Sequence, residues 1–409
     1  MQINKTMKKF LKYSLILTAL VSFYSCSNDD SKPEEIVEVK DPVIAIKLAT
    51  DFAAQKYNVI EIAPEVTIEN GEGKTPAYQW SIKVTGKDGV AKDSIIGDSK
   101  TLLFITPKSA DYTVDFKVTV DKIVKQASTK VTISETGKTY TAKALKLIEF
   151  IPAPSYFMDS YTTKEEALQQ AQISINEGGS VNLGTFGGYI VTAFDHTVVN
   201  AFGKRDFVVQ MAASTATVKY SPVSIAVAYD ANKNGIADEN EWYEIAGSEY
   251  HKSTTVKNYE ITYKKPNATA SPVAGTAAWQ YDTAYLPWTD NKNGSGTITR
   301  TNNRRRNNYY PSWAGDSYTL KGTKLFISTK DVSDGAGTTY NVGTFDWGYG
   351  GIKDSSIDIS WAVDKDGKKV HLPGVDFVKV YVPTFTALGA NDLLTSIFQE
   401  VSDLNFSKQ

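Results

Sequence analysis

Hydrophobic and polar residues alternate along most of the chain after residue 40, in short runs separated by turn residues. Between residues 41 and 135 these runs include "EVTIEN", "YQWSIKV", "TLLFITP", "YTVDFKVTV" and "ASTKVTIS". Because successive side chains of a β-strand point to opposite faces, a period of two is typical of strands with one buried face. About seven short strands at this spacing predict an immunoglobulin-type sandwich. We expect Trp80, in the middle of this region, to be a core residue; a role in stacking on a ligand is the alternative.

The same pattern continues, with longer loops, from residue 145 to residue 409. Strand-like runs there include "GYIVTAF", "RDFVVQMA", "VSIAVAYD", "YEITYKK", "IDISWAVD" and "VDFVKVYVP". Residues 135–144, "ETGKTYTAKA", are polar and are predicted to be a linker. The sequence therefore predicts an all-β protein, in which a small sandwich is followed by a larger, jelly-roll-like β-sandwich.

Two segments of the second region have helical features. In "YTTKEEALQQA", Thr163 and Glu166 have the spacing of a capping box, which predicts a short surface helix. Near the end of the chain, "ANDLLTSIFQEVSDL" places apolar residues at helical spacing. A helix packed on a sheet is the first prediction for this segment, and a strand with a turn is the alternative. The apolar positions are Leu393, Leu394, Ile397, Phe398, Val401 and Leu404.

The first 40 residues have the pattern of an export signal. Lysines precede an apolar run that is too short for a comfortable membrane span, and Ser25 precedes Cys26, the single cysteine of the chain. A lone cysteine in an exported protein has no disulfide partner, so we expect Cys26 to be the lipidated first residue after removal of residues 1–25. The alternative is an ordinary signal peptide with an accidental cysteine. Residues 26–40 are acidic and are predicted to be a tether.

Composition and the absence of known motifs argue against several classes of function. The chain has 44 basic and 46 acidic residues, for a net charge of −2, and no basic stripe that would suggest nucleic-acid binding. No transmembrane segment is predicted beyond the signal. No close histidine spacing, nucleophile elbow or phosphate-binding loop is present either, and no pair of carboxylates stands out for glycoside hydrolysis. These patterns therefore point to no particular catalytic chemistry.

One loop has the residue spacing of a calcium site. "DANKNGIADENE" follows the strand-like run "PVSIAVAY" and matches the pattern D-x-[DN]-x-[DN]-G-x5-E. Calcium prefers six to eight oxygen ligands held by a tightly curled chain, and Gly235 permits the sharp turn. The expected role is structural, and the alternative is an Asn/Gly-rich hairpin turn without a metal. The predicted ligands are Asp230, Asn232, Asn234, Ile236 (through its carbonyl oxygen), Asp238 and Glu241.

A second candidate site is rich in aromatic residues. Six of the seven tryptophans lie between Trp242 and Trp361, and residues 277–313 combine aromatic rings with Asn, Asp and three consecutive arginines. Rings beside amide and guanidinium donors can grip a planar or sugar ligand. The alternative is that these rings pack loops onto the sandwich. The predicted ligand-binding residues are Trp279, Tyr285, Trp288, Arg305, Tyr309, Tyr310 and Trp313.

The ordered motifs of the chain carry a family resemblance. "PAYQWSI" and "DYTVDFKVTV" resemble a PKD-like module, and acidic residues after Cys26 resemble the export tag of surface lipoproteins in Bacteroidetes-type bacteria. "FIPAPSYF", "LGTFGGYIVTAFDHTVVN", "YLPWTDN", "FDWGYG" and "VDFVKVYV" resemble a group of bacterial cell-surface lipoproteins with such a front module. The chain departs from that pattern at "RTNNRRRNNYYPSW", which is more basic.

The resemblance implies a non-enzymatic binder on the cell surface. Members of the group look like neighbours of TonB-dependent uptake systems, and some relatives are tied to corrinoid capture. The expectation is an outer-membrane lipoprotein that binds a nutrient, with a corrinoid as the first ligand to test. A glycan-binding module or adhesin, a polysaccharide hydrolase or lyase, and a structural surface protein without a small ligand are the alternatives.

Overall fold

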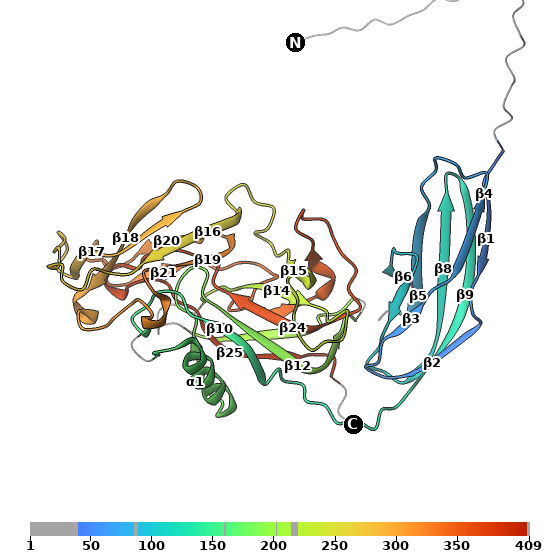
Figure 1. The fold of residues 1–409 in the computed structure, drawn as a ribbon, viewed down its shortest axis with the longest axis horizontal. Helices are drawn as coiled ribbons and strands as arrows, with labels where there is room; N and C mark the ends of the chain where they lie inside the picture. Colours follow the sequence, from blue (N-terminus) through green and yellow to red (C-terminus); the bar gives the residue numbers. More distant parts are fainter. Residues whose placement is uncertain (1–39, 86–88, 159–160, 202, 214–219, 407–409) are drawn as a thin grey trace, which may run out of the picture. The chain divides into compact units, whose positions relative to one another are not determined.

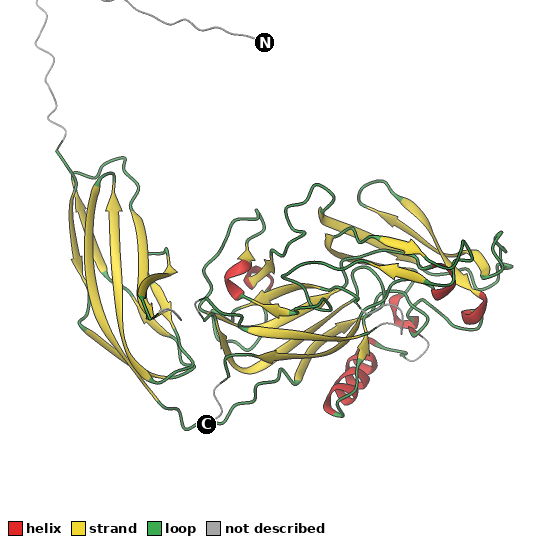
Figure 2. Ribbon diagram, turned by 180° about the vertical axis from the view of Figure 1, so that it is seen from behind, coloured by secondary structure: helices red, strands yellow, loops and turns green. Residues whose placement is uncertain are grey.

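The computed structural model describes residues 40–85, 89–158, 161–201, 203–213 and 220–406. The predicted signal peptide, Cys26 and nearly all of the predicted tether lie outside these residues. Strands dominate throughout (Figure 2). The only α-helix of the described residues is α1 (Lys164–Asn176); the other helical elements are short 3-10 helices. The all-β prediction is confirmed. No helix in the described ranges is both long and apolar enough to cross a membrane.

The first β-rich region, residues 42–134, is built from one large sheet and two small ones (Figure 1). All pairs are antiparallel except β2 with β9. The five-stranded sheet has the order β2 (Asp51–Gln55), β9 (Ile123–Ser134), β8 (Ala110–Val120), β5 (Ala77–Thr85) and β6 (Ala91–Gly97). The two-stranded sheets pair β1 (Val43–Lys47) with β4 (Glu65–Glu69), and β3 (Ile60–Ile62) with β7 (Leu102–Phe104).

Trp80 lies at the centre of this region's core. Its side chain is fully buried, its ring centroid is 4.3 Å from that of Phe116, and its indole Nε1–H donates to the Ser99 carbonyl oxygen at 2.9 Å. Burial of the apolar ring together with a satisfied N–H is the usual arrangement of a core tryptophan. Trp80 is therefore a core residue, as predicted.

The second region is a jelly roll. One sheet has the order β10 (Lys146–Ile151), β12 (Tyr189–Val199), β24 (Gly374–Tyr381), β14 (Ser224–Ala228), β15 (Trp242–Ile245) and β23 (Ala362–Val363). The facing sheet has the order β11 (Val181–Asn182), β25 (Ile397–Asp403), β13 (Phe207–Ala212) and β22 (Ser356–Ile357). Strands β11 to β14 alternate between the two sheets, and β24 and β25 return to the middle of each. That order is the one of a double-sheet jelly roll.

The jelly-roll core is apolar and is covered at one side by α1. Both sheets contribute fully buried side chains, for example Ile225 and Val378 from one and Phe207 and Phe398 from the other. The helix begins as the sequence predicts, because the Thr163 hydroxyl accepts from the Glu166 N–H at 3.0 Å. It buries its alanine face and Ile175 against this core.

A further sheet is inserted between β15 and β22. It has the order β18 (Ser295–Thr301), β17 (Gln280–Asp290), β16 (Val256–Lys264) and β19 (Ser317–Lys324), and a small hairpin of β20 (Thr329–Asp331) and β21 (Tyr340–Val342) follows. We call residues 246–355 the insert. It has its own core, in which Tyr259, Tyr263 and Leu286 are buried.

The carboxy-terminal segment is a strand and not a helix. Residues predicted as an amphipathic helix form the short turn η6 (Gly389–Asn391) and β25. Glu400 pairs with Gln210 and Phe398 with Met211, so Gln399 is an extra residue that forms a β-bulge. The bulge puts Phe398 and Val401 on the same buried face although they are three residues apart, and this spacing imitates a helix. The alternative prediction, a strand with a turn, is the correct one.

Candidate functional site

The predicted calcium loop connects β14 to β15 at one end of the jelly roll. Its curl is held by its own side chains: the Asp230 carboxylate accepts from the backbone N–H groups of Asn234 at 3.0 Å and Gly235 at 2.8 Å. Lys233 and Gly235 both have positive φ, at 56° and 75°. Gly235 is thus at a position that favours glycine. The structure brings the first half of the predicted ligand set into one tight turn.

The second half of the loop closes back on the first. The Glu241 carboxylate accepts from the N–H groups of Ala231 at 2.9 Å and Asp238 at 3.2 Å, and the Asp238 carboxylate accepts from the side-chain amides of Asn232 and Asn234. Ile236 is 59% exposed. All six predicted ligand residues therefore belong to one closed loop, and its carboxylates already accept hydrogen bonds.

The loop rests on a half-buried carboxylate of β24, which pairs with β14 in the same sheet. Asp376 in β24 accepts from the Asp230 N–H at 2.8 Å and from the Thr197 hydroxyl at 2.6 Å. Burial, with the nearby charges of Asp230 and Glu241, raises the pKa of Asp376. This concentration of negative charge at a loop end would be relieved by a cation.

Carboxylates alone do not form a metal centre in the part of the chain that the structure describes. No group of three or more His, Cys, Asp or Glu side chains there is arranged to hold a metal ion. The predicted calcium ligands are not such a cluster, because half of them are two asparagine amide oxygens and one main-chain carbonyl oxygen. Calcium at this loop stays a prediction.

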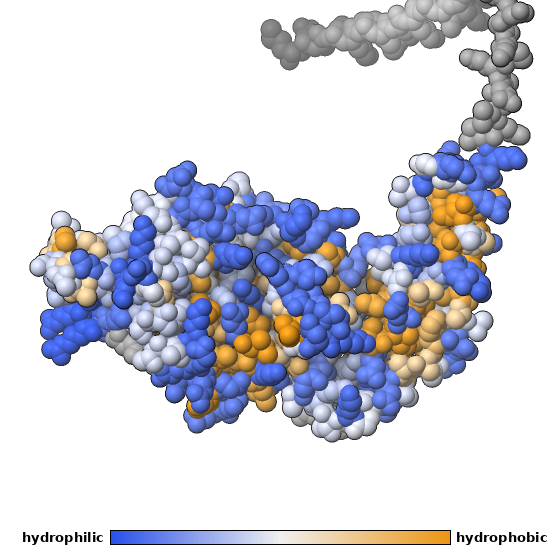
Figure 3. Space-filling model, in the orientation of Figure 1, coloured by the Kyte–Doolittle hydropathy of each residue, from blue (hydrophilic) through white to orange (hydrophobic). Residues whose placement is uncertain are grey.

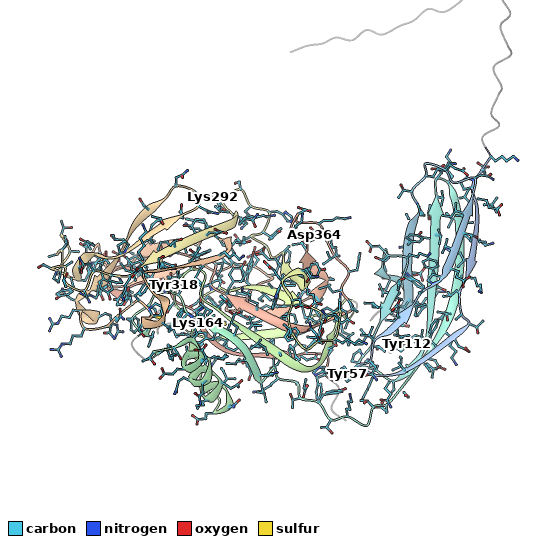
Figure 4. The ribbon with its side chains drawn as sticks, viewed as in Figure 1. Tyr57, Tyr112, Lys164, Lys292, Tyr318 and Asp364 are labelled. Carbon is cyan, nitrogen blue, oxygen red and sulfur yellow. The ribbon has the colours of Figure 1, made fainter. Side chains whose placement is uncertain are left out.

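The aromatic segment expected to be loops is mainly a β-hairpin. Residues 280–301 form β17 and β18, joined by a turn in which Asp290 accepts from the N–H groups of Lys292 and Gly294. Figure 4 labels Lys292 at the tip of this hairpin, and Figure 3 shows hydrophilic residues over the same tip. The Asn- and Gly-rich composition here marks one tight turn and not a long loop. Five of the seven rings in residues 277–313 belong to the core of the insert or pack against it.

Two of the predicted ligand-binding residues belong to that core. Tyr309 is fully buried and Tyr310 is 2% exposed, and the Tyr309 hydroxyl donates a short hydrogen bond to the Asp392 carboxylate. This burial corrects the expectation that both rings contribute to an exposed face. The physical reason is that each ring finds apolar neighbours in the insert and a partner for its hydroxyl, so packing satisfies the whole side chain.

The other predicted residues surround this core at its rim. Trp288 and Trp313 are half-buried and pack edge-on against Phe385 and Tyr318. Trp279 is half-buried, with its indole nitrogen close to Gly337. Arg305 is exposed. The predicted set is therefore clustered in space, although it does not form one continuous surface.

Two arginines are stacked on tyrosine rings beside this rim. The Arg304 guanidinium lies 3.8 Å from the ring centroid of Tyr156, and the Arg300 guanidinium lies 4.0 Å from that of Tyr285. The Tyr156 ring is in turn 4.0 Å from Phe157, whose side chain is 40% exposed. We call these residues the arginine–aromatic array: Tyr156, Phe157, Tyr285, Arg300 and Arg304.

Asparagines fix the geometry of the arginine–aromatic array. Asn307 donates from its side-chain amide to the Tyr156 carbonyl oxygen at 3.1 Å, and the Tyr285 hydroxyl donates to the Asn308 side-chain oxygen at 3.1 Å. Two consecutive asparagines are thereby bonded to the two distant segments that carry the tyrosines. Only Tyr285 was among the predicted residues. Tyr156 and Phe157 lie in the quoted motif "FIPAPSYF", and Arg304 is the first of the three consecutive arginines; these were the sequence signals for the missing members.

A buried acid lies directly behind the array. Burial raises the pKa of Asp392 to about 6, although the hydrogen bond from Tyr309 and the charge of Arg304 act in the opposite direction. Asp392 also has φ 73° and ψ −139°, a conformation that side-chain-bearing residues rarely adopt. A strained, buried carboxyl group at this place makes the stability of the site dependent on pH.

Replacement of Asp392 with asparagine is expected to change how stability depends on pH. A carboxyl group with a higher pKa in the folded protein than in the unfolded chain binds its proton more tightly when folded. Its contribution is therefore fully present below about pH 3.8 and is lost as the pH rises through about 6. The free energy of unfolding of wild type relative to Asp392→Asn should fall by about 1–3 kcal/mol between pH 4 and pH 7. Denaturant unfolding at several pH values measures this.

The Tyr309→Phe variant provides the matched comparison. It keeps the ring but removes the hydroxyl that stabilises the ionised form of Asp392, so its own loss of stability with rising pH should be steeper than that of wild type. A constant difference between wild type and Asp392→Asn over the whole range would contradict the assignment.

Comparisons with known proteins identify no family. No protein-family model matches the chain, and no curated protein matches it. Among solved structures, the three amino-terminal domains of the highly immunogenic outer capsid protein of bacteriophage RB49 are 12% identical, with a TM-score of 0.18, over 50% of this chain and 54% of that one. A quinonprotein alcohol dehydrogenase-like protein from Bacteroides thetaiotaomicron is 11% identical, with a TM-score of 0.15, over 61% and 47%. The chain thus spans about half the length of these structures, and TM-scores this low carry no argument about fold or function.

Proposed function

We propose that this protein is a non-enzymatic, lipid-anchored binder on the outer membrane that captures a nutrient for a TonB-dependent receptor. The observation that carries the proposal is the arginine–aromatic array, because guanidinium groups stacked on rings offer flat apolar contact and hydrogen-bond donors together. The exposed Phe157 ring beside Tyr156 gives a large ligand a first point of contact. Lipidation at Cys26 would provide the anchor.

The first ligand to test is a corrinoid. A corrinoid combines a broad, flat ring system with amide side chains and a phosphate. The rings of the array match the flat surface, and Arg304 can donate to the oxygen acceptors, whereas Arg300 lies 3.8 Å from the Asp282 carboxylate. Residues Trp279, Trp288, Trp313 and Arg305 would form the outer wall of the same site.

The test is co-elution of cyanocobalamin with the full mature protein on size exclusion. The expected result is an equimolar complex for wild type, with affinity lowered about tenfold or more in Arg304→Ala. Lys292→Ala is the matched control, since it removes a positive charge at the hairpin tip, away from the array. Absence of co-elution with wild type would overturn the corrinoid assignment and direct the search to a panel of glycans on the same array. Equal binding by wild type and Arg304→Ala would exclude the array as the site.

We propose in addition that the loop from Asp230 to Glu241 binds calcium in a structural role. The support is that the six predicted ligand residues form one closed turn next to the half-buried Asp376 carboxylate. Calcium would neutralise these carboxylates and fix the start of β15. Repeating the co-elution in a chelator separates a structural role from a direct role in ligand binding.

A further inference from the structure

Two tryptophans from separate segments lie side by side at the junction between jelly roll and insert. The ring centroids of Trp347 and Trp361 are 4.7 Å apart, with 54° between the ring planes. Trp347 is 41% exposed, and Trp361 is half-buried. Trp347 lies on the segment that returns from the insert, and Trp361 lies in the short helix η5 (Ile359–Trp361) after β22. We call them the tryptophan pair.

The backbone on the opposite side of the junction holds both tryptophans. Directly after β15, the Ala246 N–H donates to the Trp361 carbonyl oxygen and the Ser248 N–H to the Trp347 carbonyl oxygen, each at 3.0 Å. Between them, a Cβ atom added to Gly348 would lie 2.4 Å from the Cα atom of Gly247, and Gly348 has φ 84°. Two glycines are therefore required for the segments to cross, and the exposed ring of Trp347 stands on a fixed backbone.

The charged groups beside the tryptophan pair neutralise one another. The Arg205 guanidinium lies 4.2 Å from the Trp361 ring centroid, and its Nη1 is 3.4 Å from a carboxylate oxygen of Asp358. The cation thus covers one face of Trp361 and has its own anion. The exposed ring is consequently that of Trp347.

We infer that the tryptophan pair is a binding site for a neutral glycan, separate from the arginine–aromatic array. Indole rings present a flat, electron-rich face, and a β-linked pyranose with equatorial hydroxyls presents a flat face of C–H groups that packs against it. Keeping a large ring exposed on a rigid support is unfavourable in water, and a ligand that covers it gains that hydrophobic contact. The internal Arg205–Asp358 ion pair favours a neutral sugar over an acidic one, because neither charge is left for a ligand.

Calorimetric titration of the full mature protein with cellohexaose, xylohexaose and mannohexaose tests the inference. At least one of these β-linked oligosaccharides should bind wild type, and Trp347→Ala should weaken that binding about tenfold or more. Trp347→Phe keeps a flat ring and should retain binding within a few-fold. Circular dichroism would detect poor folding of Trp347→Ala, and in that case the affinity of Trp347→Phe is compared with wild type instead.

Controls separate this site from the array. Phe326→Ala removes another exposed ring, 66% exposed, and should leave oligosaccharide affinity unchanged. Cyanocobalamin co-elution should be the same in Trp347→Ala as in wild type, so that failure of one assignment leaves the other intact. No binding of any of the three oligosaccharides to wild type at millimolar concentration, or equal binding by wild type and both Trp347 variants, would overturn the inference.

Discussion

Replacement of Trp80 with alanine is expected to cause the largest loss of stability of any single change in the first β-rich region. The side chain is fully buried, contacts Phe116 and has its indole N–H satisfied by Ser99. Truncation removes the ring contacts and leaves a cavity, at a cost of about 3–5 kcal/mol. For a region of this size, such a loss corresponds to a fall in melting temperature of about 15–30 °C.

Calorimetry and limited proteolysis of the full chain measure this effect. We expect a transition at lower temperature and new cleavage sites confined to residues 42–134, with the jelly roll still protected. Trp347→Ala is the matched control, because it removes the same side chain from an exposed position and should cost less than about 1 kcal/mol. Equal melting curves for wild type and Trp80→Ala would show that Trp80 does not support the core.

Removal of calcium is expected to have the second largest effect. Calcium at about 100 times its dissociation constant stabilises the folded state by about 2.7 kcal/mol, which is a rise of about 5–10 °C in melting temperature for the second region. Glu241→Gln keeps the size of the side chain but removes the negative charge that would chelate the ion. It should abolish the difference between calcium and chelator while leaving the melting temperature in chelator within a few degrees of wild type.

Another aspartate turn in the same chain serves as the control for this experiment. Asp364, labelled in Figure 4, accepts from the N–H groups of Asp366 and Lys368 at 3.0 and 2.8 Å, as Asp230 does in its own turn. Its turn has Asp366 at the second ligand position but lacks the later ones, so Asp364→Ala should keep the full response to calcium. Magnesium should replace calcium poorly, because it demands a smaller octahedral shell. A wild-type melting temperature that is the same in calcium and in chelator would rule out the metal site.

The sequence correctly predicted those strands and helix ends that are determined by neighbouring residues. The alternation in "YTVDFKVTV" became β8, and the Thr163–Glu166 spacing became the amino-terminal cap of α1. The carboxy-terminal segment was mispredicted because a β-bulge at Gln399 imitates helical spacing. A bulge depends on the partner strand, which the local sequence does not show.

The same distinction applies to the candidate sites: one lies on a continuous stretch of sequence, and the others combine distant segments. The loop from Asp230 to Glu241 is a continuous stretch, so its spacing could be recognised directly. The arginine–aromatic array joins Tyr156 to Arg304, and the tryptophan pair joins residues on either side of β22. Such sites depend on which segments the fold brings together, and composition could indicate only that rings were abundant. Burial of Tyr309 likewise depends on Asp392, far away in sequence.

The strand order of the jelly roll has a consequence for how the chain folds. Val181 in β11 pairs with Phe398 in β25, and Tyr189 in β12 pairs with Tyr381 in β24, so both sheets are completed by strands near the carboxy-terminal end of the region. Because contacts so distant along the chain must wait for slow loop closure, folding should be slow and late. A chain emerging amino-terminal end first would expose unpaired edges of β11, β12 and β13 until β25 arrives. The insert, whose strands are close together in sequence, can fold before β25 is available. Its folding would shorten the effective distance between the jelly-roll strands that precede it and those that follow it.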